Sequence, residues 1–277
     1  MAAGGSSDPS LIKRIIVAVI FAPLIVWFFL YRSYPLFFFL LVLTAVCQME
    51  LYHIFNNKLN LYYRLIGHCA GIAIVADAFF TNSSYTYNIV VLTSMLYFLI
   101  NILTGNDRRL EKITLSIFST IYPAMFIIFL LKIDFLTHNI FGTFSQYFLV
   151  FILLMIWTFD TASYFVGRAF GKHRFFQKIS PKKTVEGFIG GLTATITAGV
   201  VTGIFVNRSL LIHFFLISLL VGLSCQIGDL SESIIKRDMG TKDSSHIIPG
   251  HGGFLDRFDS LLFAGPSVYM YLLVFSL

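Results

Sequence analysis

Two apolar stretches near the start of the chain decide the fold: Ile15–Leu30 reads IIVAVIFAPLIVWFFL, and Leu36–Phe55 reads LFFFLLVLTAVCQMELYHIF. The first has no charged residue, and the second has one, Glu50. A helix needs about 20 mostly apolar residues to cross a bilayer. Because no small-residue cleavage site follows Ile15–Leu30, we expect it to be the first membrane span rather than a signal peptide.

The composition of the whole chain agrees with these two stretches. Of 277 residues, 57% are hydrophobic and only 12% are charged, with a mean hydropathy of +0.80. A soluble domain carries about 25% charged residues, so a soluble globular protein is excluded. The three cysteines lie in apolar stretches without a CxxC pair, which predicts neither a disulfide framework nor a thiolate metal site.

Further apolar stretches of similar length follow along the chain and predict an all-α, polytopic membrane protein with about nine transmembrane helices. We exclude residues 1–10 from the fold, because they are small and polar and look disordered or introduced by cloning. The predicted spans are Ile15–Leu30, Leu36–Phe55, Leu65–Phe80, Asn88–Leu103, Ile113–Leu131, Tyr147–Tyr164, Phe188–Phe205, Leu210–Ile227 and Leu261–Leu277.

The distribution of Lys and Arg predicts the orientation. With the N-terminus in the cytoplasm, only Arg32, Lys132 and Arg208 of the 20 basic residues fall on the outside. Cytoplasmic loops carry an excess of Lys and Arg, so we expect the N-terminus inside and the C-terminus outside. The charge-rich loops lie late in the chain, and we therefore divide it into N-terminal membrane helices (11–145) and a C-terminal catalytic part (146–277).

Six of the 14 carboxylates fall between Asp229 and Asp259. If the preceding helix continues, Asp229, Ser233 and Lys236 share one face, and Asp256 and Asp259 share a face at the start of the last span. Carboxylates brought together in this way favour a hard cation such as Mg²⁺. The ordinary alternative is a set of ion pairs, such as Glu232 with Lys236 at i and i+4.

Two further features point to phosphate binding. Pro249–Gly253 can present backbone N–H groups to an anion, and His251 can donate a hydrogen bond to a phosphate. The preceding cytoplasmic segment supplies cations for a nucleotide or a lipid phosphate, although they could simply be positive-inside anchors; they are Arg168, Lys172, Lys182 and Lys183. Asp160 lies within an otherwise apolar span, which by itself suggests a functional role.

Other polar residues in the spans carry a weaker signal. Glu50, His53, His68 and Asp77 lie at or near predicted helix ends, where side chains can reach interfacial water. We expect none of them to contribute to a site.

These two polar segments resemble the phosphatidate cytidylyltransferase (CDP-diacylglycerol synthase) family. The C-terminal motif of that family is complete here, as Ser233, Lys236-Arg237, Lys242-Asp243, His251-Gly252-Gly253, Asp256-Arg257 and Asp259. The upstream motif is also similar: Asp160-Thr161, Gly167-Arg168, Phe170-Gly171-Lys172, Ser180-Pro181-Lys182-Lys183-Thr184 and Glu186-Gly187. Val185 departs from the Trp that is usual in the family, and we expect this to affect packing rather than chemistry.

The resemblance implies an enzyme that makes CDP-diacylglycerol and pyrophosphate from CTP and phosphatidate, with Mg²⁺. The metal-binding aspartates of the family correspond to Asp229 and Asp256, with Asp259 and Asp238 as helpers. We expect two cation sites, since two cations about 3.5–4 Å apart can stabilise both the attacking and the leaving oxygens. Asp229, Lys236 and Asp256 are therefore the predicted catalytic residues.

The remaining candidates are assigned to substrate binding. They are Asp160, Arg168, Lys172, Ser180, Lys182, Lys183, Thr184, Ser233, Arg237, His251, Gly252, Gly253 and Arg257. The sequence does not say which cluster binds CTP and which binds the lipid phosphate.

Two other functions remain open. One is another CTP-using lipid enzyme, either a polyprenol kinase or a CDP-archaeol-type synthase; the other is a transporter, although carriers place charges near the midplane. We expect a bacterial plasma membrane with the site on its cytoplasmic side, and no nucleic-acid partner. A homodimer is left open.

Overall fold

A computed structural model describes residues 9–55, 58–104, 109–241, 244–245 and 252–276. Within these residues the chain forms nine α-helices and two short 3₁₀ helices, with no β-strand. The α-helices are α1 (Pro9–Tyr31), α2 (Ser33–Ile54), α3 (Leu61–Thr81), α4 (Thr86–Thr104), α5 (Arg109–Phe141), α6 (Phe148–Phe170), α7 (Val185–Val206), α8 (Leu211–Asp238) and α9 (Leu255–Ser276), and the 3₁₀ helices are η1 (Gly142–Tyr147) and η2 (Arg208–Leu210).

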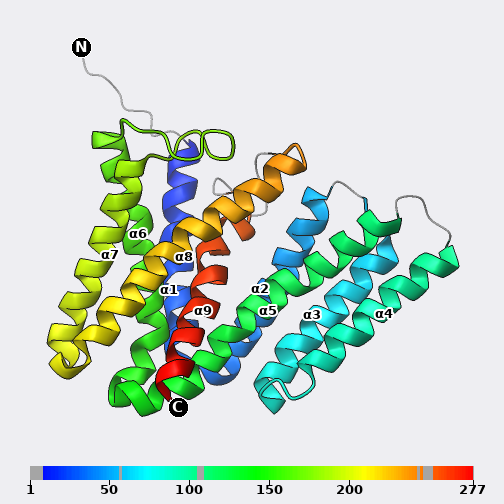
Figure 1. The fold of residues 1–277 in the computed structure, drawn as a ribbon, viewed down its shortest axis with the longest axis horizontal. Helices are drawn as coiled ribbons and strands as arrows, with labels where there is room; N and C mark the ends of the chain where they lie inside the picture. Colours follow the sequence, from blue (N-terminus) through cyan, green and yellow to red (C-terminus); the bar gives the residue numbers. More distant parts are fainter. Residues whose placement is uncertain (1–8, 56–57, 105–108, 242–243, 246–251, 277) are drawn as a thin grey trace.

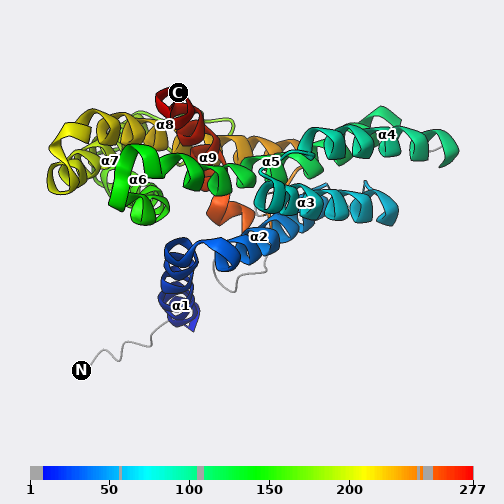
Figure 2. The same ribbon diagram turned by 90° about the horizontal axis from the view of Figure 1, so that it is seen from below.

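The helices run alternately toward one end of the molecule and the other (Figure 1). Helices α6, α7, α8 and α9 pack together on one side, and α2, α3 and α4 gather on the other. Helix α5 joins the two groups, since it packs against α2, α3 and α4 as well as α9. Helix α1 stands off the layer formed by the later helices (Figure 2). The division of the chain into parts before and after residue 145 stays a prediction. The two parts pack against each other, since α5 contacts α9.

The described helices confirm an all-α polytopic membrane protein. Seven apolar stretches are long enough to cross a membrane, and one of them, Leu110–Phe170, contains both α5 and α6. Large apolar side chains lie on the outside of the bundle, among them Phe205, which is 85% exposed. Such a surface suits lipid rather than water. The exact number of crossings and the sides of the termini stay predictions.

Several helices are longer than the hydropathy predicted. Helix α5 extends for 33 residues where 19 were predicted, α8 continues past Ile227 to Asp238, and α9 begins at Leu255 instead of Leu261. Hydropathy marks only the part of a helix that faces lipid, and a helix does not end where its residues become polar. These extensions carry the acidic residues of α8 and α9 on rigid backbone.

The turn between α3 and α4 explains why a charged residue, Asp77, lies near the end of an apolar span. Asp77 is buried and accepts hydrogen bonds from the Tyr85 amide, at 3.2 Å, and from the Thr86 hydroxyl, at 2.6 Å. Its carboxylate thus stabilises the polar turn by accepting hydrogen bonds from donors at the start of α4. This turn lies at the opposite end of the molecule from the later polar segments (Figure 1).

Candidate active site

The polar end of α8 forms one wall of the site. Because α8 remains helical to Asp238, Asp229, Ser233 and Lys236 lie on one face, as predicted. The Ser233 hydroxyl donates to Asp229 at 3.4 Å, and the Lys236 ammonium lies 3.3 Å from the buried Glu232 carboxylate. The predicted ion pair between Glu232 and Lys236 is therefore present.

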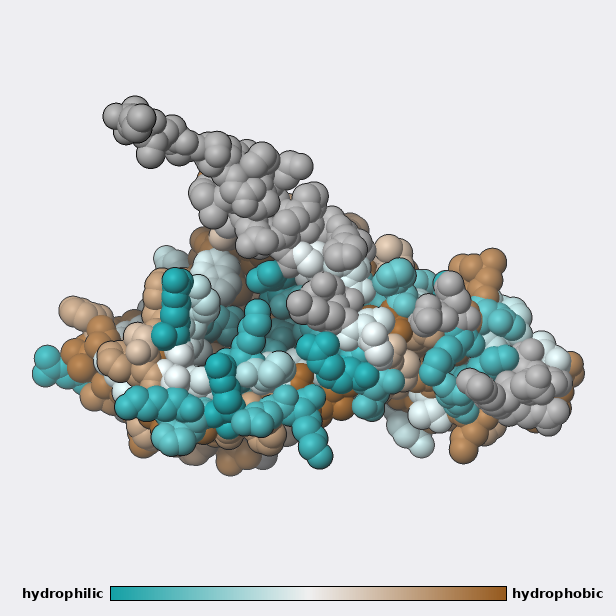
Figure 3. All heavy atoms as spheres, turned by 90° about the horizontal axis from the view of Figure 1, so that it is seen from above, coloured by the Kyte–Doolittle hydropathy of each residue, from teal (hydrophilic) through white to brown (hydrophobic). Residues whose placement is uncertain are grey.

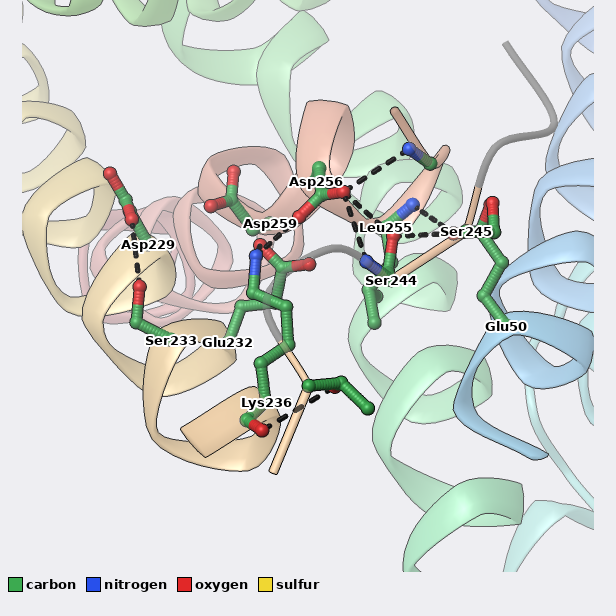
Figure 4. Close-up of polar contacts among 12 residues, drawn as sticks. Glu50, Asp229, Glu232, Ser233, Lys236, Ser244, Ser245, Leu255, Asp256 and Asp259 are labelled. Atoms are coloured by element: carbon green, nitrogen blue, oxygen red, sulfur yellow. Dashed lines mark hydrogen bonds and ion pairs between the residues drawn. The ribbon is translucent and has the colours of Figure 1, made fainter. Parts of the chain in front are cut away.

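The start of α9 faces this wall (Figure 4). Asp256 forms an ion pair with Lys236 through Oδ1. Its Oδ2 accepts hydrogen bonds from the Ser244 hydroxyl, at 2.8 Å, and from the Gly253 amide, at 3.1 Å. Asp259, one turn further along α9, is buried, and its Oδ1 accepts the Ser260 amide at 2.6 Å.

The two helices approach closely at this point because Gly228 has no side chain. A Cβ there would lie 2.5 Å from the Asp259 carbonyl oxygen, well inside van der Waals contact. Gly228 therefore lets the backbone of α8 meet that of α9 directly beside Asp229. The helix crossing brings the acidic residues of both helices to one cleft.

The segment between α6 and α7 is folded back on itself as a short hairpin-like loop. Arg174 and Thr184 form an isolated antiparallel bridge, and the Phe175 amide donates to the Lys183 carbonyl at 2.9 Å. The Glu186 carboxylate accepts the Lys172 amide at 3.1 Å and the His173 ring nitrogen at 2.6 Å. These contacts fix the backbone that carries Lys182 and Lys183.

An ion pair joins this loop to α8. The Lys183 ammonium contacts the Asp229 carboxylate, so the two polar segments identified in the sequence meet in space. Between them lies a cleft of about 710 Å³. Its wall carries six basic side chains (Arg168, Arg174, Lys182, Lys183, Lys236 and Arg257) and five acidic ones (Asp160, Asp229, Glu232, Asp256 and Asp259).

The cleft lies at the polar end of the bundle. Seen from that end, hydrophilic side chains gather over the middle of the molecule, and apolar ones lie along its edges (Figure 3). Three buried atoms in the cleft wall have no hydrogen-bond partner among the described residues: Ser163 Oγ, Gln226 Nε2 and Glu232 Oε1. Buried polar groups are normally paired, so a bound molecule or ion would complete this wall.

A second, smaller pocket of about 290 Å³ adjoins the cleft. It lies between α1, α6 and α9, and most of its wall is apolar, with Phe21, Ile25, Leu153, Ile156 and Trp157 among the lining residues. Four residues line both spaces: Asp160, Asp256, Arg257 and Asp259. The polar cleft and the apolar pocket therefore meet at these four side chains.

Most of the predicted site residues are brought together in this cleft. Those that line it are Asp160, Arg168, Lys182, Lys183, Thr184, Asp229, Lys236, Asp256, Arg257 and Asp259. The Thr184 hydroxyl also caps α7 by accepting the Gly187 amide at 3.2 Å. Gly253 contacts Asp256 from beside the cleft. His251 lies outside the described residues.

Other predicted residues do not line the cleft: Lys172, Ser180, Ser233, Arg237, Asp238 and Gly252. Arg237 donates instead to the carbonyls of Ile179 and Thr241, at 3.3 and 3.4 Å, and so ties the loop to the end of α8. Asp238 is exposed at the last position of α8. At a rise of about 1.5 Å per residue it is about 13 Å further along the axis than Asp229, so the structure does not bring the two together.

Besides Asp77, a second residue expected near interfacial water is buried. Glu50 does not reach interfacial water: it is 1% exposed and accepts hydrogen bonds from residues near the start of α9. Arg174 and Gln226 also line the cleft although neither was singled out. The upstream basic cluster was the one sequence signal that included Arg174. No sequence signal indicated Gln226 or a role for Glu50.

The donors in the cleft fit a hard cation. Five carboxylates share the wall, and two of them, Asp229 and Asp256, hold the ammonium groups of Lys183 and Lys236. The oxygen-only chemistry of this set and the partnerless Glu232 Oε1 suit Mg²⁺. Among the described residues no three acidic, His or Cys side chains already form a metal-binding group, so the metal assignments stay predictions.

Comparison with known proteins agrees with this geometry. Residues 12–275 match the model of the cytidylyltransferase family. A phosphatidate cytidylyltransferase of Bacillus subtilis is 30% identical over 95% of this chain and 98% of its own length.

Two further relatives match over a shorter length. The phosphatidate cytidylyltransferase of Staphylococcus saprophyticus is 46% identical over 121 residues, and that of Haemophilus influenzae is 38% identical over 154. These matches span about half of each relative, 46% and 53% of its length. The resemblance inferred from the two motifs is confirmed, and the chain belongs to the cytidylyltransferase family.

Proposed function

We propose that this chain is an integral membrane nucleotidyltransferase that makes CDP-diacylglycerol and pyrophosphate from CTP and phosphatidate, for phospholipid biosynthesis. An oxygen of the phosphatidate phosphate attacks the α-phosphorus of CTP. The bond from that phosphorus to the β-phosphate oxygen breaks, and pyrophosphate leaves. The cytidylyltransferase relatives support this reaction over the alternatives.

The junction of the polar cleft and the apolar pocket carries the proposal. Phosphatidate has an anionic headgroup on two acyl chains, and CTP is wholly polar. A cleft rich in basic side chains suits the phosphates of both substrates, while the pocket between α1, α6 and α9 suits apolar chains. Asp160, Asp256, Arg257 and Asp259 lie where the two spaces meet, which is where the reacting phosphates would come together.

The basic side chains answer the main difficulty of the reaction, which is to bring two polyanions together. A phosphate monoester has a second pKa of about 6 and is mostly dianionic at neutral pH, so the nucleophile needs no strong general base. Arg168, Lys182 and Arg257 would hold phosphate oxygens, since cations aimed at the developing charge stabilise such a transition state. Lys183 and Lys236 position Asp229 and Asp256 as well as adding positive charge.

The acidic side chains would hold Mg²⁺. Asp229, Asp256 and Asp259 are the proposed ligands, and the number of cations stays a prediction. When bound, the cation supplies charge neutralisation for the phosphate oxygens. The Lys183 and Lys236 ammonium groups contact two of these proposed ligands, Asp229 and Asp256.

We also propose that the cleft opens on the cytoplasmic side of a bacterial plasma membrane. Seventeen of the 20 Lys and Arg residues are assigned to the same side as the cleft, which supports this orientation. CTP is cytosolic and phosphatidate is held in the bilayer, so a site at the ends of the helices can reach both.

A lipid panel tests the substrate assignment. Purified protein in detergent would be incubated with Mg²⁺ and with CTP labelled at either the α- or the γ-phosphate. The lipids would be phosphatidate, a polyprenol and an archaeol-type phosphate. We expect α-label in a lipid product with phosphatidate alone. γ-Label in polyprenol would show a kinase, preference for the archaeol-type lipid would show the other synthase, and no turnover would reopen transport.

A further inference from the structure

A carboxylate from the N-terminal part of the chain is buried against the start of α9. Glu50 lies near the end of α2 and is 1% exposed. Its Oε1 accepts the Phe254 amide at 2.8 Å and the Ser245 hydroxyl at 2.5 Å. Its Oε2 accepts the Leu255 amide at 2.6 Å, and the Ser244 hydroxyl oxygen lies 3.4 Å from it. Figure 4 shows this carboxylate pointing toward the backbone of α9.

Three donors, the Phe254 and Leu255 amides and the Ser245 hydroxyl, account for the burial of a charged group. A buried carboxylate is costly unless it is well hydrogen-bonded, and the first amides of a helix have no partner within the helix. Glu50 therefore caps α9 with a side chain from a helix about 200 residues earlier in the chain. The negative charge also suits the positive end of the helix dipole.

Ser244, which contacts Glu50, also contacts Asp256. The Ser244 hydroxyl contacts Glu50 and donates to Asp256 Oδ2 at 2.8 Å. Gly253, whose amide donates to Asp256, has no room for a side chain, since a Cβ there would lie 1.9 Å from the Ser244 hydroxyl and 2.7 Å from Glu50 Oε2. Glu50, Ser244 and Gly253 thus form one hydrogen-bonded unit around the residue proposed to bind the cation.

We propose that Glu50 is a positioning residue for the transferase reaction: it fixes the start of α9 and the Ser244–Ser245 segment, and through them the place of Asp256 and Arg257 in the cleft. This inference rests on the proposed function. A cap that served stability alone would lower the melting temperature without a specific effect on turnover. A positioning residue affects kcat, because a small displacement of a catalytic group costs far more in rate than in substrate binding.

Glu50→Gln is the first test. The variant keeps Oε1 but places an NH₂ group against the Leu255 amide, so that a donor faces a donor. We expect kcat to fall by about tenfold or more, with KM for CTP and for phosphatidate changed by less than about threefold. We also expect faster amide hydrogen exchange in a peptide covering 252–258. Gln48→Met is the matched control, since Gln48 is buried on the same helix but bonds to α3 through the Gly67 carbonyl.

Ser245→Ala is the second test, and it keeps the proposal falsifiable if Glu50→Gln does not fold. It removes one donor to Glu50, and we expect a smaller loss of kcat with the same rise in exchange at 252–258. Because the two residues share one hydrogen bond, their effects in the double variant should be less than additive.

The outcomes separate this proposal from the function on which it rests. If Glu50→Gln keeps wild-type kcat, or loses kcat with no change in exchange at 252–258, Glu50 is not a positioning residue. An equal loss of kcat in Gln48→Met would overturn the proposal in the same way. If wild-type protein makes no CDP-lipid, the proposed function fails, while hydrogen exchange still reports whether Glu50 holds α9.

Discussion

At the scale of single residues, Asp256 links α8 to the segment that precedes α9. It contacts Lys236 from α8 and accepts hydrogen bonds from Ser244 and Gly253. We expect Asp256→Asn to lower turnover of CTP with phosphatidate by about 10²-fold to 10³-fold, because it removes charge where the cation and phosphates would bind. CDP-lipid formation by purified variant and wild-type protein measures this.

A matched control shows whether the loss of any ion-paired carboxylate would lower turnover. Glu111 also pairs with a lysine, Lys58, at 2.8 Å, but it lies on α5 outside the cleft lining. We expect Glu111→Gln to retain turnover within about twofold, since exposed ion pairs contribute little. Near-normal turnover in folded Asp256→Asn would contradict the metal assignment.

Gly253 gives a second prediction at this scale. In Gly253→Ala the new methyl group would have to displace the Ser244 hydroxyl, whose bonds to Glu50 and Asp256 would be lost. We expect turnover to fall by about tenfold or more, the effect of losing a hydrogen bond to a charged group.

Gly265→Ala is the comparison for that variant. Gly265 is on the same helix, and the nearest atom to its Cβ, Leu130 Cδ2, is 3.3 Å away. Turnover should stay within about twofold, because the leucine can move slightly. Equal losses in the two variants would show that α9 tolerates no added methyl group, and would remove the special role given to position 253.

At the scale of elements, the loop between α6 and α7 depends on Glu186. In Glu186→Ala the amides of Lys172 and His173 lose their acceptor, and the backbone carrying Lys182 and Lys183 loosens. We expect kcat/KM to fall by about tenfold to 100-fold, the effect of a misplaced binding group, with faster amide exchange across 171–184. Unchanged amide exchange together with full activity would show that the loop keeps its structure without Glu186.

The elements also show which parts of the structure could be predicted from the sequence. The length of the apolar stretches predicted each helix. The spacing of Asp229, Ser233 and Lys236 correctly placed them on one helix face, because the helical repeat fixes which residues share a face. The assignments of Arg237 and Asp238 came from the family motif instead, and neither residue lines the cleft. A motif shows that residues recur together, but the direction of each side chain around the helix decides which of them reach the cleft.

At the scale of the whole molecule, the alternation of helices predicts opposite sides for two exposed positions. Ser84 lies in the α3–α4 turn and Lys178 in the α6–α7 loop, at opposite ends of the bundle. In a Cys69→Ser background, we expect an impermeant maleimide on intact cells to label Ser84→Cys, and to label Lys178→Cys only after permeabilisation. Labelling of both from the same side would contradict the proposed orientation.

The long-range contacts are the part that the sequence could not reveal. The ion pair of Lys183 with Asp229 joins the two polar segments that carry the motifs. Glu50 with Leu255 joins positions about 200 residues apart with no motif at the first of them. A single acidic residue at the end of an apolar span looks the same whether it faces water or caps a distant helix, so only packing distinguishes the two.

The proposed reaction transfers CMP to phosphatidate at the cleft where the polar and apolar spaces meet. Its most direct test is the stoichiometry of products from wild-type protein, CTP and phosphatidate in the presence of Mg²⁺. We predict one pyrophosphate released for each CDP-diacylglycerol formed, with no free CDP. Release of CDP together with a newly phosphorylated lipid, or no lipid product at all, would contradict this reaction.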